Sequence, residues 1–186
     1  VRDNSVIDYV VISACGKGTR LYPMTKNIPK FLVNCENKNF LTMMFEYWST
    51  YSSQFIIILD DIYNDIVNYY IEQYNTTASK KITVEIVNIK CPDGYENSFT
   101  LSHGVPNKCY NKKVLVTWCD IMPREDILLK DMSENIIFTY KTYSRYKACQ
   151  QTQNIYKHEN GNIVGIYYFC KFKQLQTNDY TKDLCD

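Results

Sequence analysis

Long apolar runs and an excess of charge of either sign are both missing from this sequence of 186 residues. The apolar run Phe55–Leu59 has the length of a strand and is far too short to cross a bilayer. The formal net charge is +1, and the basic residues are scattered rather than clustered. These absences argue against a membrane protein and against a nucleic-acid-binding module, so we expect neither a membrane nor a nucleic acid as a partner.

Histidine is scarce, and closely paired cysteines are absent. The chain has two histidines, and none of its eight cysteines forms a C-x-x-C pair, so the ligand spacing of a zinc site is missing. The chain is also larger than the small secreted domains that disulfides hold together. We therefore expect mostly free thiols and a reducing, cytoplasmic location. The cysteines are Cys15, Cys35, Cys91, Cys109, Cys119, Cys149, Cys170 and Cys185.

Apolar residues nevertheless make up 45% of the chain, which is enough for a folded core. The length fits one domain, and we expect residues 1–186 to form it. Because the chain begins at Val1 rather than Met, we also expect it to be a piece of a longer protein. The sequence leaves the oligomeric state open, and a homo-oligomer is compatible with it.

Strand-like and helix-like segments alternate along most of the chain. β-branched runs predict strands at Val6–Ser13, Gln54–Asp60, Lys81–Ile89, Lys112–Asp120, Glu134–Tyr140 and Gly161–Lys173. Helical patterns fall at Asn39–Tyr51, Asp61–Tyr74, Glu96–Val105 and Arg124–Met132. This order predicts an α/β fold, a Rossmann-like three-layer domain whose central sheet is mixed but mostly parallel, with helices on both faces.

Two of these helices have a recognisable apolar face. In the first, apolar residues recur at helical spacing at Phe40, Leu41, Met44, Phe45, Trp48 and Tyr51. In the second, the spacing places Ile62, Ile66, Tyr69, Tyr70 and Tyr74 on one face. The first of these patterns predicts an amphipathic helix.

The stretch Ser13–Lys30, "SACGKGTRLYPMTKNIPK", follows the first predicted strand and is rich in glycine and proline. It lacks the G-x-x-x-x-G-K-[ST] pattern of a P-loop. It also lacks the third glycine of the dinucleotide fingerprint, and Pro23 and Pro29 prevent a single long helix. Ligands of such sheets bind beyond the carboxyl ends of the strands, where this stretch and Asp120 are both expected.

The stretch instead resembles the signature G-x-G-T-R-[LM]-x-P-x-T-x-x-x-P-K of nucleotidyltransferases that make sugar nucleotides. All nine specified positions match: Gly16, Gly18, Thr19, Arg20, Leu21, Pro23, Thr25, Pro29 and Lys30. The resemblance implies a fold of the nucleotide-diphospho-sugar transferase type. It extends, with its motifs in order, over about Val6 to Tyr140.

The chemistry of a triphosphate fits these residue types. Small residues let backbone N–H groups approach a dense anion, and the resemblance implies nucleotide binding by Ala14, Cys15, Gly16, Lys17, Gly18 and Thr19. Arg20 offers a planar fork for phosphate oxygens, and Lys30 offers a mobile point charge. The resemblance gives both a catalytic role. The family usually has glycine or alanine at the position of Cys15.

Two later segments also resemble the family. Pro92, Asp93 and Gly94 match a P-x-G loop that meets the nucleotide base, and Pro92 and Gly94 are the binding candidates. Asp120 ends an apolar strand where the family has Gly-Asp, and the resemblance implies that it binds a catalytic Mg²⁺. Cys119 replaces the glycine. Each pattern alone also fits a bland interpretation, an ordinary turn for P-D-G and a helix cap for the aspartate.

The resemblance weakens after Tyr140. Arg145 and Tyr146 match a family stretch near the sugar site, but its Glu-Lys-Pro element is absent and Tyr167, Tyr168 and Phe169 stand about where it is expected. A second metal-binding aspartate usually follows. The candidates for it are Asp179, Asp183 and Asp186.

We expect an enzyme that uses Mg²⁺ to transfer a nucleoside monophosphate from a nucleoside triphosphate to a sugar 1-phosphate, with release of pyrophosphate. One alternative is a CTP-dependent cytidylyltransferase acting on phosphocholine or another non-sugar acceptor. Trp118, Tyr167 and Tyr168 suit it, because aromatic faces hold quaternary ammonium groups. Another alternative is a catalytically silent, nucleotide-binding regulatory domain. The base and the acceptor are not determined by the sequence.

Overall fold

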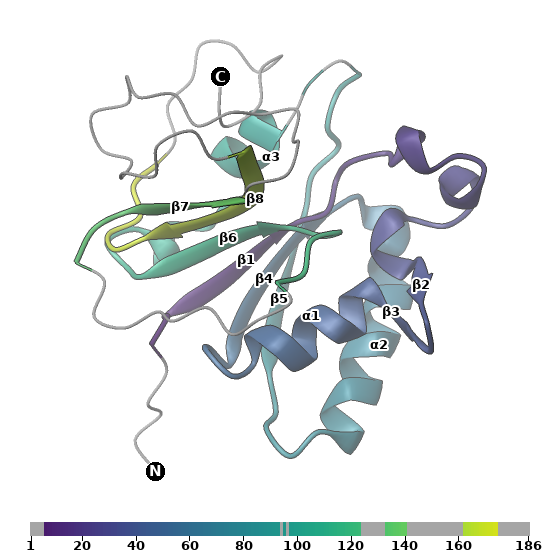
Figure 1. Ribbon diagram of the computed structural model, residues 1–186, viewed down its shortest axis with the longest axis horizontal. Helices are drawn as coiled ribbons and strands as arrows, with labels where there is room; N and C mark the ends of the chain where they lie inside the picture. The colour runs from purple at the N-terminus through teal and green to yellow at the C-terminus, as the bar shows by residue number, and fades with distance from the viewer. Residues whose placement is uncertain (1–5, 94, 96, 124–132, 141–161, 175–186) are drawn as a thin grey trace.

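The computed structural model describes residues 6–93, 95, 97–123, 133–140 and 162–174. Its centre is a six-stranded sheet in the order β5-β4-β1-β6-β8-β7 (Figure 1). The strands are β1 (Tyr9–Ser13), β4 (Gln54–Leu59), β5 (Thr83–Asn88), β6 (Val114–Trp118), β7 (Ile136–Tyr140) and β8 (Asn162–Phe169). A short hairpin, β2 (Asn34–Cys35) with β3 (Lys38–Asn39), stands apart from it.

The sheet is parallel on one side and antiparallel on the other. Strand β1 runs parallel to both β4 and β6, and β4 runs parallel to β5. Strand β8 is antiparallel to both of its neighbours and lies between β6 and β7. The predicted α/β fold with a mixed, mostly parallel sheet is therefore confirmed, with β8 as the element that makes the sheet mixed.

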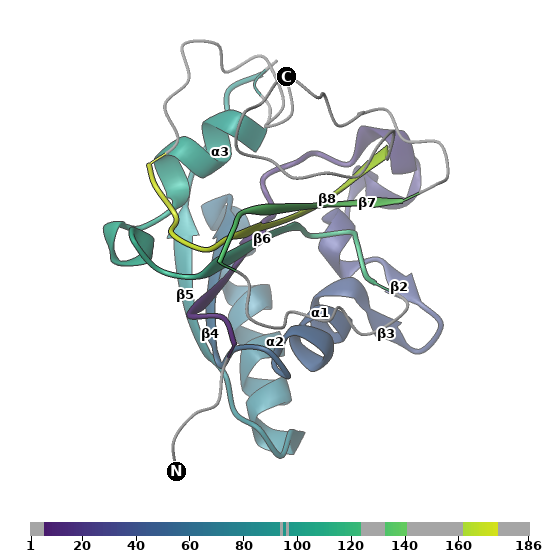
Figure 2. The same cartoon turned by 60° about the vertical axis from the view of Figure 1, so that its left-hand side comes forward.

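Helices cover both faces of the sheet, as Figures 1 and 2 show. Helices α1 (Phe40–Trp48) and α2 (Asn64–Thr77) lie on one face, and α3 (Asn97–Gly104) lies on the other. Consecutive residues of β1 alternate between the two cores, because side chains alternate across a strand. Val10 and Ile12 pack in the core under α1 and α2, and Val11 packs in the core under α3.

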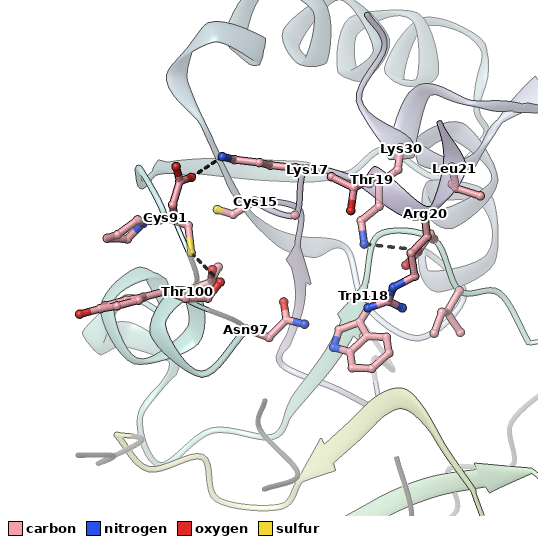
Figure 3. Close-up of a pocket in the computed structure, with 17 residues that line it drawn as sticks. Cys15, Lys17, Thr19, Arg20, Leu21, Lys30, Cys91, Asn97, Thr100 and Trp118 are labelled. Atoms are coloured by element: carbon pink, nitrogen blue, oxygen red, sulfur yellow. Dashed lines mark hydrogen bonds and ion pairs between the residues drawn. The ribbon is translucent and has the colours of Figure 1, made fainter. Parts of the chain in front are cut away.

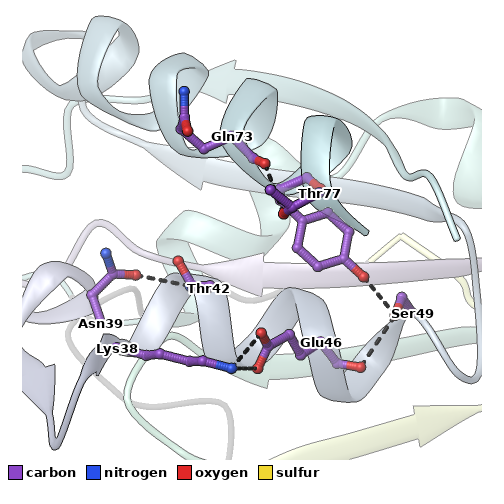
Figure 4. Close-up of polar contacts among 8 residues, drawn as sticks. Lys38, Asn39, Thr42, Glu46, Ser49, Gln73 and Thr77 are labelled. Carbon is purple, nitrogen blue, oxygen red and sulfur yellow. Dashed lines mark hydrogen bonds and ion pairs between the residues drawn. The ribbon is translucent and has the colours of Figure 1, made fainter. Parts of the chain in front are cut away.

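Helix α1 buries the face that its sequence predicts. Leu41, Met44, Phe45 and Trp48 are buried in the core on that side of the sheet. The helix begins where the side chain of Asn39 accepts a hydrogen bond from the Thr42 N–H at 2.8 Å, which satisfies one of the free donors of the first turn (Figure 4).

Helix α2 was predicted correctly as a helix, but the apolar face given for it was only partly right. Its members Tyr70 and Tyr74 do pack against the core, whereas the others are exposed. Ile62 is 70% exposed and Tyr69 is 52% exposed. The residues packed against the core are Val67, Tyr70, Ile71 and Tyr74, which are spaced i, i+3, i+4 and i+7. Ile62 lies in a separate 3-10 turn (Asp61–Tyr63) before the helix, so its position does not follow the helical period. The buried hydroxyl of Tyr74 donates to Ser49 Oγ at 2.9 Å.

Three further expectations concern the chain as a whole. Six cysteines within the described residues are free thiols, as predicted: Cys15, Cys35, Cys91, Cys109, Cys119 and Cys170. Among the helices of the described part, none combines the length and the apolar character needed to cross a membrane. The helix expected at Arg124–Met132 lies outside the described residues.

Candidate nucleotide-binding site

Three loops meet at the carboxyl ends of the parallel strands and enclose a cavity of about 440 Å³ (Figure 3). One loop follows β1, one follows β5, and one follows β6, as expected for ligand sites of such sheets. The cavity is lined by Cys15, Gly16, Lys17, Gly18, Thr19, Arg20, Leu21, Lys30, Cys91, Pro92, Asp93, Tyr95, Asn97, Thr100, Trp118, Asp120 and Ile121. It therefore gathers most of the predicted site residues in one place.

The loop after β1 is a chain of three short 3-10 turns, Thr19–Leu21, Met24–Lys26 and Lys30–Leu32. Gly18 precedes the first turn in a left-handed conformation, with a φ of 65° that other residues rarely adopt. The buried Thr25 hydroxyl donates to the Gly18 carbonyl at 2.6 Å. These two motif residues hold the loop in its curved path.

Among the predicted binding residues that the structure describes, Ala14 is the one that does not line the cavity. It is 4% exposed, and its backbone N–H donates to the carbonyl of Ile58 at 2.8 Å. Its backbone donor is thus used to continue the sheet. Gly16 lies beside Lys30, where an added Cβ would stand 3.4 Å from Cε and Nζ of the lysine.

Lys30 and Asp120 both line the cavity and form an ion pair. The Lys30 Nζ and Asp120 Oδ2 atoms are 3.3 Å apart, and their side chains are 18% and 30% exposed. Burial alone lowers the pKa of Lys30, but Cys119 and Asp120 act against it, so the pKa lies above its ordinary value. Because burial raises the pKa of the Cys119 thiol to about 12, that thiol is neutral at physiological pH. Asp120 is therefore the effective counter-charge of Lys30 in that range.

The second carboxylate oxygen of Asp120 is chemically unusual. Oδ1 is buried and has no hydrogen-bond partner among the described residues. Leaving such an acceptor unpaired costs on the order of 1–3 kcal/mol, and more for a charged group. A divalent cation would satisfy it, since hard cations prefer carboxylate oxygens. Within the described residues no cluster of three His, Cys, Asp or Glu side chains forms a complete metal site, and Asp179, Asp183 and Asp186 lie outside them.

The loop after β5 closes the other side of the cavity. Lys17 forms an ion pair with Asp93, which joins the first loop to this one (Figure 3). The hydrogen bond to Asp93 raises the pKa of Lys17, and the same bond lowers the pKa of Asp93. Both side chains are well exposed, so solvent screens the pair. Pro92 lines the cavity, whereas Gly94 lies outside the described residues.

Asn97 and Thr100 from α3 also line the cavity, although no motif pointed to them. The hydroxyl of Ser13, at the end of β1, donates to Asn97 Oδ1 at 2.8 Å. This bond occupies the carbonyl oxygen and leaves the amide NH₂ as the group that Asn97 can offer to a ligand. The available signal was the position of Asn97 at the start of a short helix after the second loop.

Cys15 occupies the position where small residues are usual in similar loops. Its thiol donates to the carbonyls of Ile58 at 3.6 Å and Ile89 at 3.7 Å, at the ends of β4 and β5. Burial raises its pKa to about 11, so it is uncharged at neutral pH. The cysteine thus adds a neutral side chain to the wall of the cavity rather than a charge.

The remaining predicted groups divide between the cavity and the core. Arg20 is exposed and, with Trp118, lies at the end of the cavity opposite Cys15 and Cys91 (Figure 3). Tyr167 and Tyr168 are each 2% exposed and pack in the two cores, so neither forms part of the cavity wall. Of the three aromatic residues considered for an ammonium group, Trp118 alone lines the cavity. Arg145 and Tyr146 lie outside the described residues.

Three solved structures illustrate the similarity of fold. The CTP:phosphocholine cytidylyltransferase LicC from Streptococcus pneumoniae aligns over 88% of this chain and 71% of its own, with 22% identity and a TM-score of 0.61. A UDP-glucose pyrophosphorylase complexed with UDP-glucose aligns over 88% of this chain and 76% of its own, with 16% identity and a TM-score of 0.66. The corresponding enzyme from Acinetobacter baumanii gives 15% identity, a TM-score of 0.66, and coverage of 88% and 74%.

The TM-scores and coverage of these structures establish the fold, and the family follows from the sequence. No curated protein sequence matches this chain. The family model described as nucleotidyl transferase matches residues 9–149, which is well over half of the chain. The matched span includes the glycine loop, the second loop and Asp120, which together border the cavity. The chain therefore belongs to the nucleotidyl transferase family.

Proposed function

We propose that this chain is a Mg²⁺-dependent nucleotidyltransferase that transfers a nucleoside monophosphate from a nucleoside triphosphate to a sugar 1-phosphate. The observation that carries the proposal is the Lys30–Asp120 pair, 3.3 Å apart, in the wall of a cavity that the glycine loop also borders. A fixed cation beside a carboxylate with a free oxygen suits a site that binds phosphate and metal together.

The reaction needs little covalent participation by the protein. An oxygen of the acceptor phosphate attacks the α-phosphorus and forms a new P–O bond. The bond between the α-phosphorus and its bridging oxygen breaks, and pyrophosphate leaves with the electron pair. Positioning and charge neutralisation are the main contributions of the protein. Lys30 neutralises charge on the acceptor and α-phosphates, and Arg20 neutralises charge on the leaving pyrophosphate.

Asp120 is the residue that would hold Mg²⁺, through the oxygen that no described residue hydrogen-bonds. When bound, the ion supplies positive charge to the phosphate oxygens. The loop from Cys15 to Thr19 places backbone N–H groups along the triphosphate, with Gly18 supplying the left-handed turn. Pro92 and Gly94 border the base. The proposal takes residues 1–186 as a single nucleotidyltransferase domain that acts in the cytoplasm.

Phosphocholine is a second candidate acceptor, and one observation favours it. Trp118 lines the cavity, and an indole face attracts a quaternary ammonium group by about 0.5–2 kcal/mol. The lack of a Glu-Lys-Pro element near the expected sugar site agrees with this alternative. Similar folds serve both a phosphocholine cytidylyltransferase and UDP-glucose pyrophosphorylases, so the fold does not decide between the acceptors.

The test is a pyrophosphate-release assay with ATP, CTP, GTP, UTP and dTTP, each paired with glucose 1-phosphate or phosphocholine, with and without Mg²⁺. We expect turnover in one pairing, dependent on Mg²⁺ and reduced at least about 100-fold by Lys30→Ala and by Asp120→Ala. Lys26→Ala is the matched control, because Lys26 is an exposed lysine of the same loop that does not line the cavity. Nucleotide binding without turnover in any pairing would instead support a silent regulatory domain.

A further inference from the structure

Trp118 and Gly165 form a contact that only a glycine allows. Trp118 is the last residue of β6, and Gly165 lies in β8, the strand paired with it. A Cβ added at Gly165 would stand 2.3 Å from Trp118 Cδ2, 2.4 Å from Cε3 and 2.8 Å from Cε2. These distances are far below van der Waals contact, so any side chain at this position would displace the indole.

The contact is made through the face of the indole. Cδ2 is a ring-fusion atom that is surrounded by other ring atoms in the plane, so a point nearest to it lies above or below that plane. Gly165 also has a φ of 79°, a conformation that disfavours other residues. Glycine inside a strand weakens it unless something requires a close approach. Here the requirement is the indole that lies flat on the backbone of β8.

The rest of the indole borders the cavity on the β8 side of the site. Trp118 pairs in register with Ser13 of β1, which immediately precedes the glycine loop. It stands two residues before Asp120 and lines the same cavity, together with the apolar Leu21 and Ile121. Pro92, which is proposed to border the base, follows β5, at the far edge of the sheet from β8.

In-line attack fixes where the acceptor must stand. The nucleophile approaches the phosphorus from the side opposite the leaving group. With the base at the second loop and the triphosphate along the glycine loop, the acceptor stands on the side of Lys30 and Asp120, where Trp118 also lines the cavity. We infer that Trp118 is a specificity-determining residue for the acceptor and that Gly165 positions its indole. This inference rests on the function proposed above.

The chemistry that this surface recognises is a group with polarised C–H bonds packed against an aromatic face. A trimethylammonium group presents such bonds, and so does one face of a pyranose ring. Loss of the aromatic contact should weaken binding of the acceptor by about tenfold and should leave binding of the nucleotide nearly unchanged. If Trp118 had only a structural role, its substitution would raise KM for both substrates or lower the fraction of folded protein.

The first experiment measures KM for the acceptor and for the nucleotide in Trp118→Leu, with phosphocholine and glucose 1-phosphate as separate arms. We expect the acceptor KM to rise about tenfold, the nucleotide KM to change by less than about twofold, and Trp118→Phe to recover most of the loss. Tyr69→Leu is the matched control, because Tyr69 is a 52% exposed aromatic residue on α2, away from the cavity. The acceptor that supports turnover, phosphocholine or glucose 1-phosphate, is the one whose C–H groups contact the indole.

The second experiment uses tryptophan fluorescence. The chain has two tryptophans, and Trp48 is fully buried in the core under α1 and α2. A fluorescence change that depends on the acceptor should therefore come from Trp118. Acceptor is added to protein saturated with a non-hydrolysable nucleoside triphosphate analogue. We expect a saturable change in wild type that Trp118→Phe lacks. Gly165→Ala should raise the acceptor KM as Trp118→Leu does, because it moves the ring.

The results separate this inference from the proposed function. If wild type turns over but Trp118→Leu keeps its acceptor KM within about twofold, the inference is wrong while the function stands. If wild type turns over nothing, the proposed function fails. In that case the fluorescence decides the inference, since a saturable acceptor signal lost in Trp118→Phe supports it and an unchanged signal refutes it.

Discussion

The Lys30–Asp120 pair allows a prediction that separates its structural from its chemical role. At 3.3 Å and an effective dielectric of about 20, two opposite charges attract by about 5 kcal/mol. The cost of removing both charges from water cancels much of this, and the remaining exposure of 18% and 30% screens part of the rest. We therefore expect a coupling free energy of about 1–3 kcal/mol between the two side chains.

The perturbation is a double-mutant cycle of Lys30→Met, Asp120→Asn and the double variant. Lys30→Met leaves Asp120 without its counter-charge and with Oδ1 still unpaired, so the free energy of unfolding should fall by about 1–3 kcal/mol. In the double variant no charge remains, and stability should return to within about 1 kcal/mol of wild type. Turnover should stay at least about 100-fold reduced in all three.

Urea unfolding followed by circular dichroism gives the stabilities, and pyrophosphate release gives turnover. Mg²⁺ at millimolar concentration should raise the stability of Lys30→Met more than that of the double variant, since Asp120 is the proposed ligand. Additive losses in the double variant would refute the reasoning, because they would show that the two charges do not act on each other.

Three further predictions concern other features of the cavity. The pKa of Lys30 in the folded protein is raised above its ordinary value of 10.5. The ion pair therefore contributes its full stability below pH 10.5, and this stability is lost as the pH rises through the higher folded pKa. Above about pH 10.5, the urea midpoint of wild type should fall more than that of Lys30→Met. Among the described cysteines, the exposed Cys35 should react first with a thiol reagent at pH 7. Cys15, with a pKa of about 11, should react slowly, and bound nucleotide should slow its reaction further. Mass mapping of the labelled peptides measures both rates. Gly18→Ala should lose about 1–2 kcal/mol of stability in urea unfolding, because Gly18 has a φ of 65°. Gly16→Ala should lose clearly less, because the added Cβ would stand at an ordinary 3.4 Å from Lys30. Equal losses would contradict the special backbone role given to Gly18.

The glycine loop could be predicted because its residue types carry the information locally. Pro23 and Pro29 exclude a long helix, and the structure shows three short turns instead. Gly18 takes the left-handed conformation that glycine favours. Asp120 could be placed near this loop from the topology of parallel strands alone, and the structure brings its carboxylate to Lys30.

Other features depend on packing that the sequence pattern does not encode. The buried face of α2 was predicted only in part, at Tyr70 and Tyr74. Ile62 and Tyr69 are as apolar as the residues that are buried, and only the position of the helix on the sheet decides between them. The amide of Asn97 acquires its orientation from Ser13, which is 84 residues away. Gly165 gave no signal either, because its role depends on the ring of Trp118 in another strand.

The place of β8 between β6 and β7 has a consequence for how the chain folds. Strands β1, β4, β5 and β6 are complete once the ribosome has passed residue 118, so the nucleotide side of the sheet can assemble early. The free edge of β6 then has to wait for residues 162–169 before it is covered. Such long-range pairing is slow, and an open edge exposes unpaired backbone groups. A nascent chain halted between these points would thus present a sheet edge that chaperones or other nascent chains can bind.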